Sequence, residues 1–401
     1  MSTPSSRLST AHTAEAPRPS KHIVGLDALR MIAACIVMFG HLTYFMWIEQ
    51  PHLPAIAIAA RPFVWFGWVG VEIFFVLSGF VIAYSAYGLV ASPSATPPHI
   101  VFLHHRLKRL LPGAFLCSFF TVVTLLLTDP MPAYRVALNW VRTMLLLPQA
   151  PWPILHIPLV DLSYWTLSLE ATFYALVYVL LRLKRIDKLP AVMGTLGAIS
   201  SLHWIAFFLL HPPGAGIERW SYPTNLHALA QMTLVTNGCY FAIGVFFWLC
   251  LFHGVTWKRI AILCLCIVGG VLQIIQRWDR FADIPSTVAV VLWLLSLAFI
   301  LACSVFNRRV QLTLGHRGAV ILRRIGLMTY PLYLIHFEFG KRLILAIRGT
   351  VGDWPAAAIA MTSSLLLAYL ISKFLEPLGQ RALWHVMTRK PNTEAASHTT
   401  A

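Results

Sequence analysis

Charged residues are scarce in this chain. Asp, Glu, Lys and Arg make up 11% of its 401 residues, whereas 58% are hydrophobic and the mean hydropathy is +0.71. An ordinary soluble domain carries roughly 25% charged residues. A chain of this composition cannot cover several soluble domains with polar surface. The composition therefore indicates a polytopic membrane protein.

Paired cysteines and metal-binding spacings are also missing. The 7 cysteines are an odd number, lie within apolar runs, and form no CxxC motif or His/Cys cluster with zinc spacing. We interpret them as small buried hydrophobic residues. The pattern excludes a secreted disulfide scaffold, and we expect neither a metal site nor a bound cofactor.

Acidic residues are rarer than basic ones, with 15 Asp and Glu against 31 Lys and Arg, for a formal net charge of +16. A basic protein can bind nucleic acid through its phosphates. Here, however, the basic residues are dispersed between apolar runs. Membrane topology explains this distribution better, and we expect no nucleic-acid partner.

Apolar runs of about 20 residues, each long enough to cross a bilayer as a helix, recur along the chain. They predict an all-α bundle of about ten transmembrane helices. The segment 134–149 is too short for a further crossing and carries two arginines, so we place it at the membrane interface. The expected spans are 23–48, 63–87, 110–128, 163–182, 189–210, 226–252, 258–276, 285–306, 325–347 and 355–376.

The distribution of basic residues predicts the orientation of this bundle. With the N-terminus in the cytoplasm, 22 of the 31 Lys and Arg fall on the cytoplasmic side, as the positive-inside rule requires. Both termini are then cytoplasmic. We divide the chain into a disordered tail (1–22), a membrane domain (23–376) and a second cytoplasmic tail (377–401).

Ionisable side chains inside the apolar runs are candidates for function, because they are costly in hydrocarbon. The clearest are His41, Glu72, Glu170 and His336, with Glu338 close by. At about 1.5 Å per residue, His41, Glu72 and Glu170 fall at about 10–13 Å from the outer ends of their spans. Packing alone is the alternative explanation for any one of them, but a shared depth favours a site.

Arg30 and His41 are eleven residues apart, which is about three helical turns, so both side chains point to one face of the first helix. Their axial separation is roughly 16 Å. This arrangement suits a long substrate with an anionic head at one end and a reactive group at the other. A local ion pair between Arg30 and Asp27 is the alternative.

The run His104-His105-Arg106-Leu107-Lys108-Arg109 precedes the third span. It is either an ordinary topogenic loop or a phosphate clamp, since arginine offers several donors in a rigid fork. The pattern alone leaves both interpretations open.

Six segments together resemble acyltransferase family 3, the integral-membrane enzymes that O-acylate surface carbohydrates. The resemblance extends over about 24–376. The segments are GLDALRMIAACIVMFGH (25–41), GVEIFFVLSGFVIA (70–83), HHRLKRLLP (104–112), YWTLSLEATFY (164–174), FAIGVFFW (241–248) and MTYPLYLIH (328–336).

The chain departs from the family pattern at two places. The second glutamate that commonly follows Glu170 is Ala171 here, so only Glu170 of that pair can act. The usual Ser-Tyr-Ser reads Thr329-Tyr330-Pro331, and the proline predicts a kink in that helix.

The resemblance implies a multi-pass enzyme of the bacterial inner membrane that moves an acyl group from cytoplasmic acyl-CoA to a hydroxyl of lipopolysaccharide or another cell-surface or exported glycan. The acyl group implied first is acetyl, with acetyl-CoA as the donor. Arg30, Arg106 and Arg109 would bind the donor. His41 would act as general base, oriented by Glu170 or Glu72; an acyl-histidine intermediate is the variant. The reserve candidates are Ser78, His336 and Glu338.

Two other functions remain as alternatives. A tailoring acyltransferase of a small hydrophobic metabolite, such as a macrolide, would use the same residues on another acceptor. A proton-coupled transporter would also carry intramembrane His and carboxylates, and such transporters often contain inverted repeats. We find no internal repeat in the sequence.

Overall fold

The computed structural model describes residues 22–49, 66–92, 94–146, 157–211, 230, 232–278 and 286–388. Within these ranges the regular structure is helical throughout, with no strand, so the predicted all-α fold is confirmed. The expected tail at 1–21 and the last residues from 389 onward lie outside the described residues. The longer helices are α1 (Val24–Glu49), α3 (Val69–Ala91), α4 (Pro98–Thr128), α5 (Ala133–Met144), α6 (Trp165–Arg182), α7 (Leu189–Leu210), α9 (Gly238–Phe252), α10 (Trp257–Trp278), α11 (Ser286–Val305), α12 (Asn307–Val351), α13 (Asp353–Leu370) and α14 (Glu376–Thr388).

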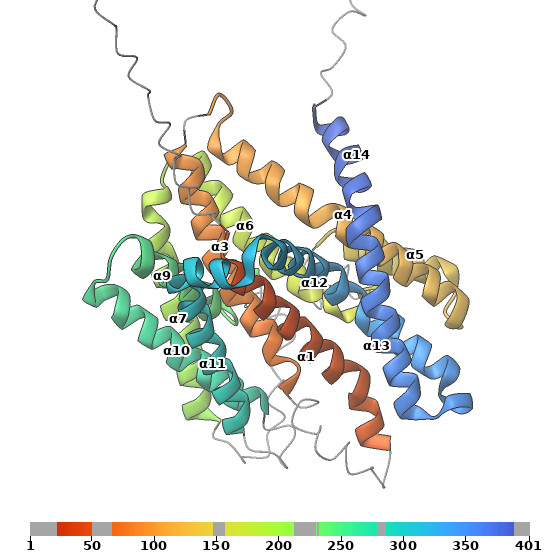
Figure 1. Cartoon of the computed structure of the whole chain (residues 1–401). Helices are drawn as coiled ribbons and strands as arrows, with labels where there is room; N and C mark the ends of the chain where they lie inside the picture. Colours follow the sequence, from red (N-terminus) through yellow and green to blue (C-terminus); the bar gives the residue numbers. More distant parts are fainter. Residues whose placement is uncertain are drawn as a thin grey trace, which may run out of the picture.

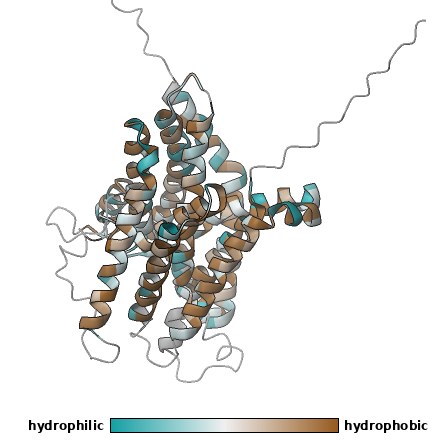
Figure 2. Cartoon of the chain, turned by 90° about the vertical axis from the view of Figure 1, so that its left-hand side faces the viewer, coloured by the Kyte–Doolittle hydropathy of each residue, from teal (hydrophilic) through white to brown (hydrophobic). Residues whose placement is uncertain are grey.

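The described helices form one bundle (Figure 1). Nine helical segments in this part of the chain are long and apolar enough to cross a membrane, and α9 is a shorter apolar helix. Hydrophobic residues make up much of the helix ribbon (Figure 2), and many large hydrophobic side chains are exposed, as expected where lipid replaces water. The chain is therefore a multi-pass membrane protein, and each of the ten expected spans overlaps one of these helices.

Some helix boundaries differ from the predicted ones. Helix α4 begins at Pro98, so the basic run 104–109 is helical and not a loop. Pro98 occupies the first turn, where its missing N–H leaves no helical hydrogen bond unmade. The segment 134–149, expected at the membrane interface, contains most of helix α5. At the C-terminal end of the described chain, a π-helical turn, Ile371–Leu375, joins α13 to α14. Helical structure therefore continues beyond the expected end of the last span at 376.

Helix α12 is unusually long, at 45 residues, and breaks at Gly315. This glycine has φ 62° and ψ 178°, a conformation that residues with a Cβ rarely adopt. Pro331 lies inside the helix, but the non-helical backbone angles fall at Gly315 alone. The break in this helix thus lies sixteen residues before the proline at which the sequence predicts a kink.

The main core surrounds α3, which crosses α9 at very short range. A Cβ added at Gly79 or Gly244 would lie well under 3.0 Å from the backbone of the facing helix. Small residues permit such contacts between membrane helices. The crossing fixes the position of α3, whose opposite side carries Ser78.

Candidate active site

Helices α1 and α12 pack side by side and run in the same direction (Figure 1). A Cβ at Gly326 would lie 2.5 Å from Asp27, and a Cβ at Gly340 would lie 2.6 Å from Leu42. The two glycines are fourteen residues apart, and their partners on α1 are fifteen apart. This parallel register places the stretch of α1 from Arg30 to His41 beside about 329–340 of α12.

His41 contacts His336 across this helix pair. The Nδ1 atom of His41 lies 2.8 Å from the Nε2 atom of His336, and the two rings are parallel to within 1°. His336 is fully buried, whereas His41 is half-buried. Phe337 packs edge-on against His41 at 5.0 Å between ring centroids. From the sequence His336 is only a reserve candidate, because nothing in the sequence shows its partner.

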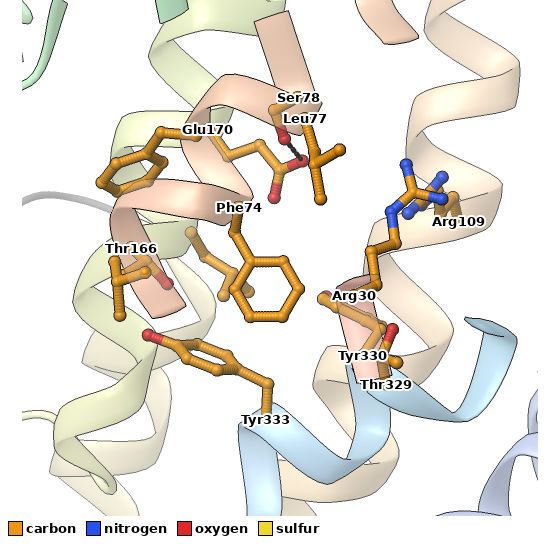
Figure 3. A pocket seen from close by; sticks show the side chains of 13 residues that line it. Arg30, Phe74, Leu77, Ser78, Arg109, Thr166, Glu170, Thr329, Tyr330 and Tyr333 are labelled. Atoms are coloured by element: carbon orange, nitrogen blue, oxygen red, sulfur yellow. Dashed lines mark hydrogen bonds between the residues drawn. The ribbon is translucent and has the colours of Figure 1, made fainter. Parts of the chain in front are cut away.

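A cleft between α1, α3, α4, α6 and α12, here called the inner cavity, contains about 620 Å³ of unfilled space, part of it open to solvent. Its wall combines charged, hydroxyl and aromatic side chains (Figure 3). The residues that line it are Arg30, Val71, Phe74, Phe75, Leu77, Ser78, Arg109, Thr166, Leu167, Glu170, Thr329, Tyr330 and Tyr333.

Glu170 enters the inner cavity on the side opposite Arg30 and Arg109 (Figure 3). Its Oε1 atom accepts hydrogen bonds from the hydroxyl of Ser78, at 3.1 Å, and from the hydroxyl of Tyr174. The hydrogen bonds of this carboxylate in the described structure do not include one to His41. Glu170 and Ser78 therefore lie next to each other in the wall of the inner cavity.

A second cleft, here called the basic vestibule, adjoins the inner cavity. It contains about 990 Å³ of unfilled space, part of it open to solvent. Cationic groups predominate in its wall, so it is suited to a polyanion. The residues that line it are His22, Asp27, Arg30, His105, Lys108, Arg109, Arg323, Gly326, Leu327, Tyr330, Glu376 and Gln380.

Three residues line both cavities: Arg30, Arg109 and Tyr330. The two clefts therefore share a boundary formed by two guanidinium groups and a phenol ring. The hydroxyl of Tyr330 donates to the carbonyl of Leu110 at 2.8 Å, which holds this ring against α4. His41 lines neither cavity. Tyr333 at the far end of the inner cavity stands 5.8 Å from the His336 ring, and so separates the cavity from the histidine pair.

Arg30 also makes the local ion pair that the sequence allows. Its Nη1 atom donates to Asp27 at 3.1 Å, while His22 contacts the other carboxylate oxygen at 2.5 Å. The Arg30 side chain retains 13% exposure. The ion pair and the cavity position thus coexist: Asp27 orients the guanidinium that both cavities share.

The two arginines of the RxxR motif occupy different environments. Arg109 lines both cavities. Arg106 lines neither, and donates instead to the hydroxyl of Ser85 at 2.7 Å. Its guanidinium carbon also lies 5.1 Å from the Phe102 ring centroid and 5.6 Å from that of Tyr174. Arg106 therefore packs α4 against α3 and α6.

The two glutamates predicted near His41 do not lie at one level. Glu170 bonds to Ser78, which is six residues further along α3 than Glu72, a rise of about 9 Å. Glu72 is fully buried, outside both cavity linings, and within electrostatic range of Cys239 on α9. The shared layer of three ionisable groups expected from span lengths is therefore wrong, because span ends did not fix the relative heights of α3 and α6.

Glu338 belongs to an ionic cluster that lies further along α12 than the vestibule residues. It accepts from Arg342 at 2.9 Å, and Arg342 also donates to Asp129. The Glu338 backbone N–H donates to Asp161 at 2.9 Å. Burial raises the pKa of Asp161 to about 6, against the lowering effect of its backbone donors. This cluster ties α12 to α4 and to the loop before α6.

The sequence did not single out Tyr330, Tyr174 and Arg323 as residues of the site. Tyr330 and Tyr174 are tyrosines within motifs, but an apolar helix offers no signal that separates a site tyrosine from a core one. Arg323 belongs to a basic stretch that topology already explained, whereas Lys108 lies in the run 104–109 that the sequence offered as a possible phosphate clamp. Among the described residues, no group of three or more His, Cys, Asp or Glu could hold a metal ion.

A family model described as an acyltransferase domain matches residues 23–373. The chain belongs to acyltransferase family 3. The resemblance drawn from the six segments is thereby confirmed over almost the whole bundle. No solved structure matches the chain significantly.

Three relatives of this family-3 chain have names that describe acyl transfer. YrhL of Bacillus subtilis (strain 168), whose name assigns it as a peptidoglycan O-acetyltransferase, is 28% identical over 56% of this chain and 33% of its own length. Acyltransferase MdmB of Streptomyces mycarofaciens is 26% identical over 86% of this chain and 87% of its own. Peptidoglycan O-acetyltransferase OatA of Listeria monocytogenes is 22% identical over 89% of this chain and 55% of its own. The chain thus spans one third of the first relative and about half of the third.

Proposed function

We propose that this family-3 protein is an O-acyltransferase that moves an acyl group, acetyl in the simplest case, from acyl-CoA to a hydroxyl of a cell-surface or exported glycan. One observation carries the proposal. A basic vestibule and a hydroxyl-lined inner cavity meet at Arg30 and Arg109, inside a domain of the acyltransferase family. The vestibule suits the anionic nucleotide of the donor, and the smaller inner cavity suits its uncharged pantetheine arm.

The orientation of the vestibule toward the cytoplasm is part of this proposal. The basic residues Lys108 and Arg323 lie in its wall, and both belong to stretches that the positive-inside rule assigns to the cytoplasm. Acyl-CoA is a cytoplasmic metabolite, so the donor would enter from this side. Both termini of the chain would then be cytoplasmic.

In the proposed reaction His41 acts as general base. It takes the proton of the acceptor hydroxyl as the oxygen attacks the thioester carbonyl, and returns that proton to the departing CoA thiolate. The new ester bond replaces the thioester bond, so atoms and charge balance. The Phe74 and Tyr333 rings, 5.8 Å apart at the end of the inner cavity, must move aside for the thioester to reach His41. No covalent acyl-enzyme is required.

Glu170 has a role distinct from orientation of His41. It faces the guanidinium groups of Arg30 and Arg109 across the inner cavity (Figure 3), and its bonds to Ser78 and Tyr174 fix its own position. We propose that it holds the arm of the donor through these hydroxyls and balances the two cations. Arg106 acts by packing α4, which places Arg109.

The experiment that tests the function uses the protein in proteoliposomes, with acetyl-CoA labelled in the acetyl group. Hydrolysis or transfer of the label that depends on His41 supports the proposal. In parallel, mass spectrometry compares surface glycans of cells with and without the gene. Loss of one acetyl increment, restored by the wild-type gene and not by His41→Ala, is expected. Unchanged glycans together with no turnover of acyl-CoA would refute the proposal.

A small hydrophobic metabolite is the second candidate acceptor. The apolar part of the inner cavity wall, formed by Phe74, Phe75, Leu77 and Leu167 among others, favours it. Metabolite profiling of the same two strains separates the cases. Loss of an acylated metabolite with unchanged glycans would identify this acceptor class.

A further inference from the structure

The carbonyl groups around His336 determine which of its ring nitrogens carries hydrogen. The Nδ1 atom lies 3.1 Å from the carbonyl oxygen of Leu332 and 2.9 Å from that of Tyr333. Carbonyl oxygens only accept hydrogen bonds. Nδ1 must therefore be the protonated nitrogen, and it donates to the preceding turn of α12.

The other nitrogen of His336, Nε2, then acts as an acceptor. A proton on both nitrogens would create a cation on a side chain that is fully buried, which is costly. In the neutral ring Nε2 holds a lone pair. Its partner is Nδ1 of His41 at 2.8 Å, so His41 donates from Nδ1. A neutral His41 then has its own lone pair on Nε2.

We infer that His336 is a positioning residue that holds His41 in the Nδ1–H tautomer, so that the Nε2 atom of His41 is the base that receives the acceptor's proton. This inference rests on the proposed function for its catalytic meaning. In a catalytic triad an acidic residue orients the histidine base. Here a second histidine, almost 300 residues away in the sequence, would have that role.

The geometry suits both stages of proton transfer. The two rings are parallel to within 1°, so the His41 N–H can point at the Nε2 lone pair in the plane of the ring. When His41 gains a proton on Nε2, its Nδ1–H keeps the same acceptor and the ring does not need to turn. The helix carbonyls hold His336 in place during both stages.

The test compares two amides of similar chemistry at position 336. In His336→Gln the side-chain oxygen can reach the former place of Nε2 and accept from His41. In His336→Asn the shorter amide can still donate to the carbonyls of α12, but offers no acceptor at the Nε2 position. Both variants keep a polar side chain that bonds to the helix, so Asn controls for the loss of imidazole packing.

Two measurements are made in lipid bilayers. The first is ¹⁵N NMR of histidine-labelled protein, with His41→Gln used to assign the His41 signals. We expect an unprotonated Nε2 on His41 in the wild type and in His336→Gln, and a mixture of tautomers in His336→Asn. The second is the kinetics of acyl transfer. General-base catalysis contributes about 10²–10⁴-fold, so we expect kcat to fall roughly 10²-fold in His336→Asn with an unchanged donor KM, and to lie within about tenfold of wild type in His336→Gln.

A protonated Nε2 on His41 in the wild type would overturn the inference, whatever the activity. So would equal rates for the Gln and Asn variants, whether both were active or both inactive. The NMR result does not require turnover. If the wild type shows the expected tautomer but transfers no acyl group to any acceptor, the proposed function fails while the assignment of His336 stands.

Discussion

Replacement of the two arginines of the RxxR motif should have unequal effects on donor binding. Arg109→Gln removes a cation that lines both cavities. A hydrogen bond to a charged group contributes about 1.5–3 kcal/mol. Loss of one phosphate contact should therefore raise the KM for acyl-CoA about 10- to 150-fold. Because this contact holds the donor equally in the ground and transition states, kcat should change little.

Arg106→Gln is the matched control, with the same substitution three residues earlier on the same helix. Its guanidinium bonds to Ser85 and stacks near Phe102 and Tyr174, away from both cavities. The donor KM should stay within about threefold of wild type, while loss of the charged hydrogen bond lowers the free energy of unfolding by about 2 kcal/mol. Steady-state kinetics in proteoliposomes and thermal unfolding in detergent measure the two effects. A similar rise in donor KM for both variants, or for neither, would refute the assignment of Arg109 and not Arg106 to the donor site.

Three further changes test other parts of the structure. His41→Ala should abolish acyl transfer, because it removes the base, while the variant still elutes as a folded species in size-exclusion chromatography. Retained turnover would exclude the general-base role. Gly244→Ala should destabilise the protein by about 1–3 kcal/mol, because the Cβ of the alanine must displace the backbone of α3. Thermal unfolding unchanged from wild type would contradict the close crossing of α3 and α9. Asp161 has a folded pKa of about 6 against an ordinary value of 3.8. Its ionisation should therefore lower the free energy of unfolding by about 3 kcal/mol as the pH rises from about 4 to above 6. Asp161→Asn should lack this pH-dependent loss, and identical pH profiles of unfolding for the wild type and the variant would argue against a buried, desolvated carboxyl.

The spans could be predicted from composition, because a membrane helix must satisfy its backbone internally and face lipid with apolar side chains. The common face of Arg30 and His41 could also be predicted, since it depends on helical periodicity alone. In the structure both side chains turn toward α12, where Arg30 meets the cavity residues and His41 meets His336. The break at Gly315 could not be foreseen, because many helices tolerate a glycine without breaking.

Contacts between side chains of different helices could not be predicted from the sequence. The bond between His41 and His336 joins residues that are 295 positions apart, and no local pattern encodes it. The different environments of Arg106 and Arg109 depend on which side of α4 faces the clefts. The relative heights of Glu72 and Glu170 depend on how far α3 and α6 slide along each other, which span ends do not determine.

The boundary that the two clefts share also bears on membrane permeability. A protein that admits a long substrate through the bilayer risks conducting protons and metal cations along the same route. At Arg30 and Arg109 any such ion would meet two fixed positive charges, which form an electrostatic barrier to cations. The same pair that attracts a polyanion thus allows the passage to remain closed to the ion gradients that the cell maintains.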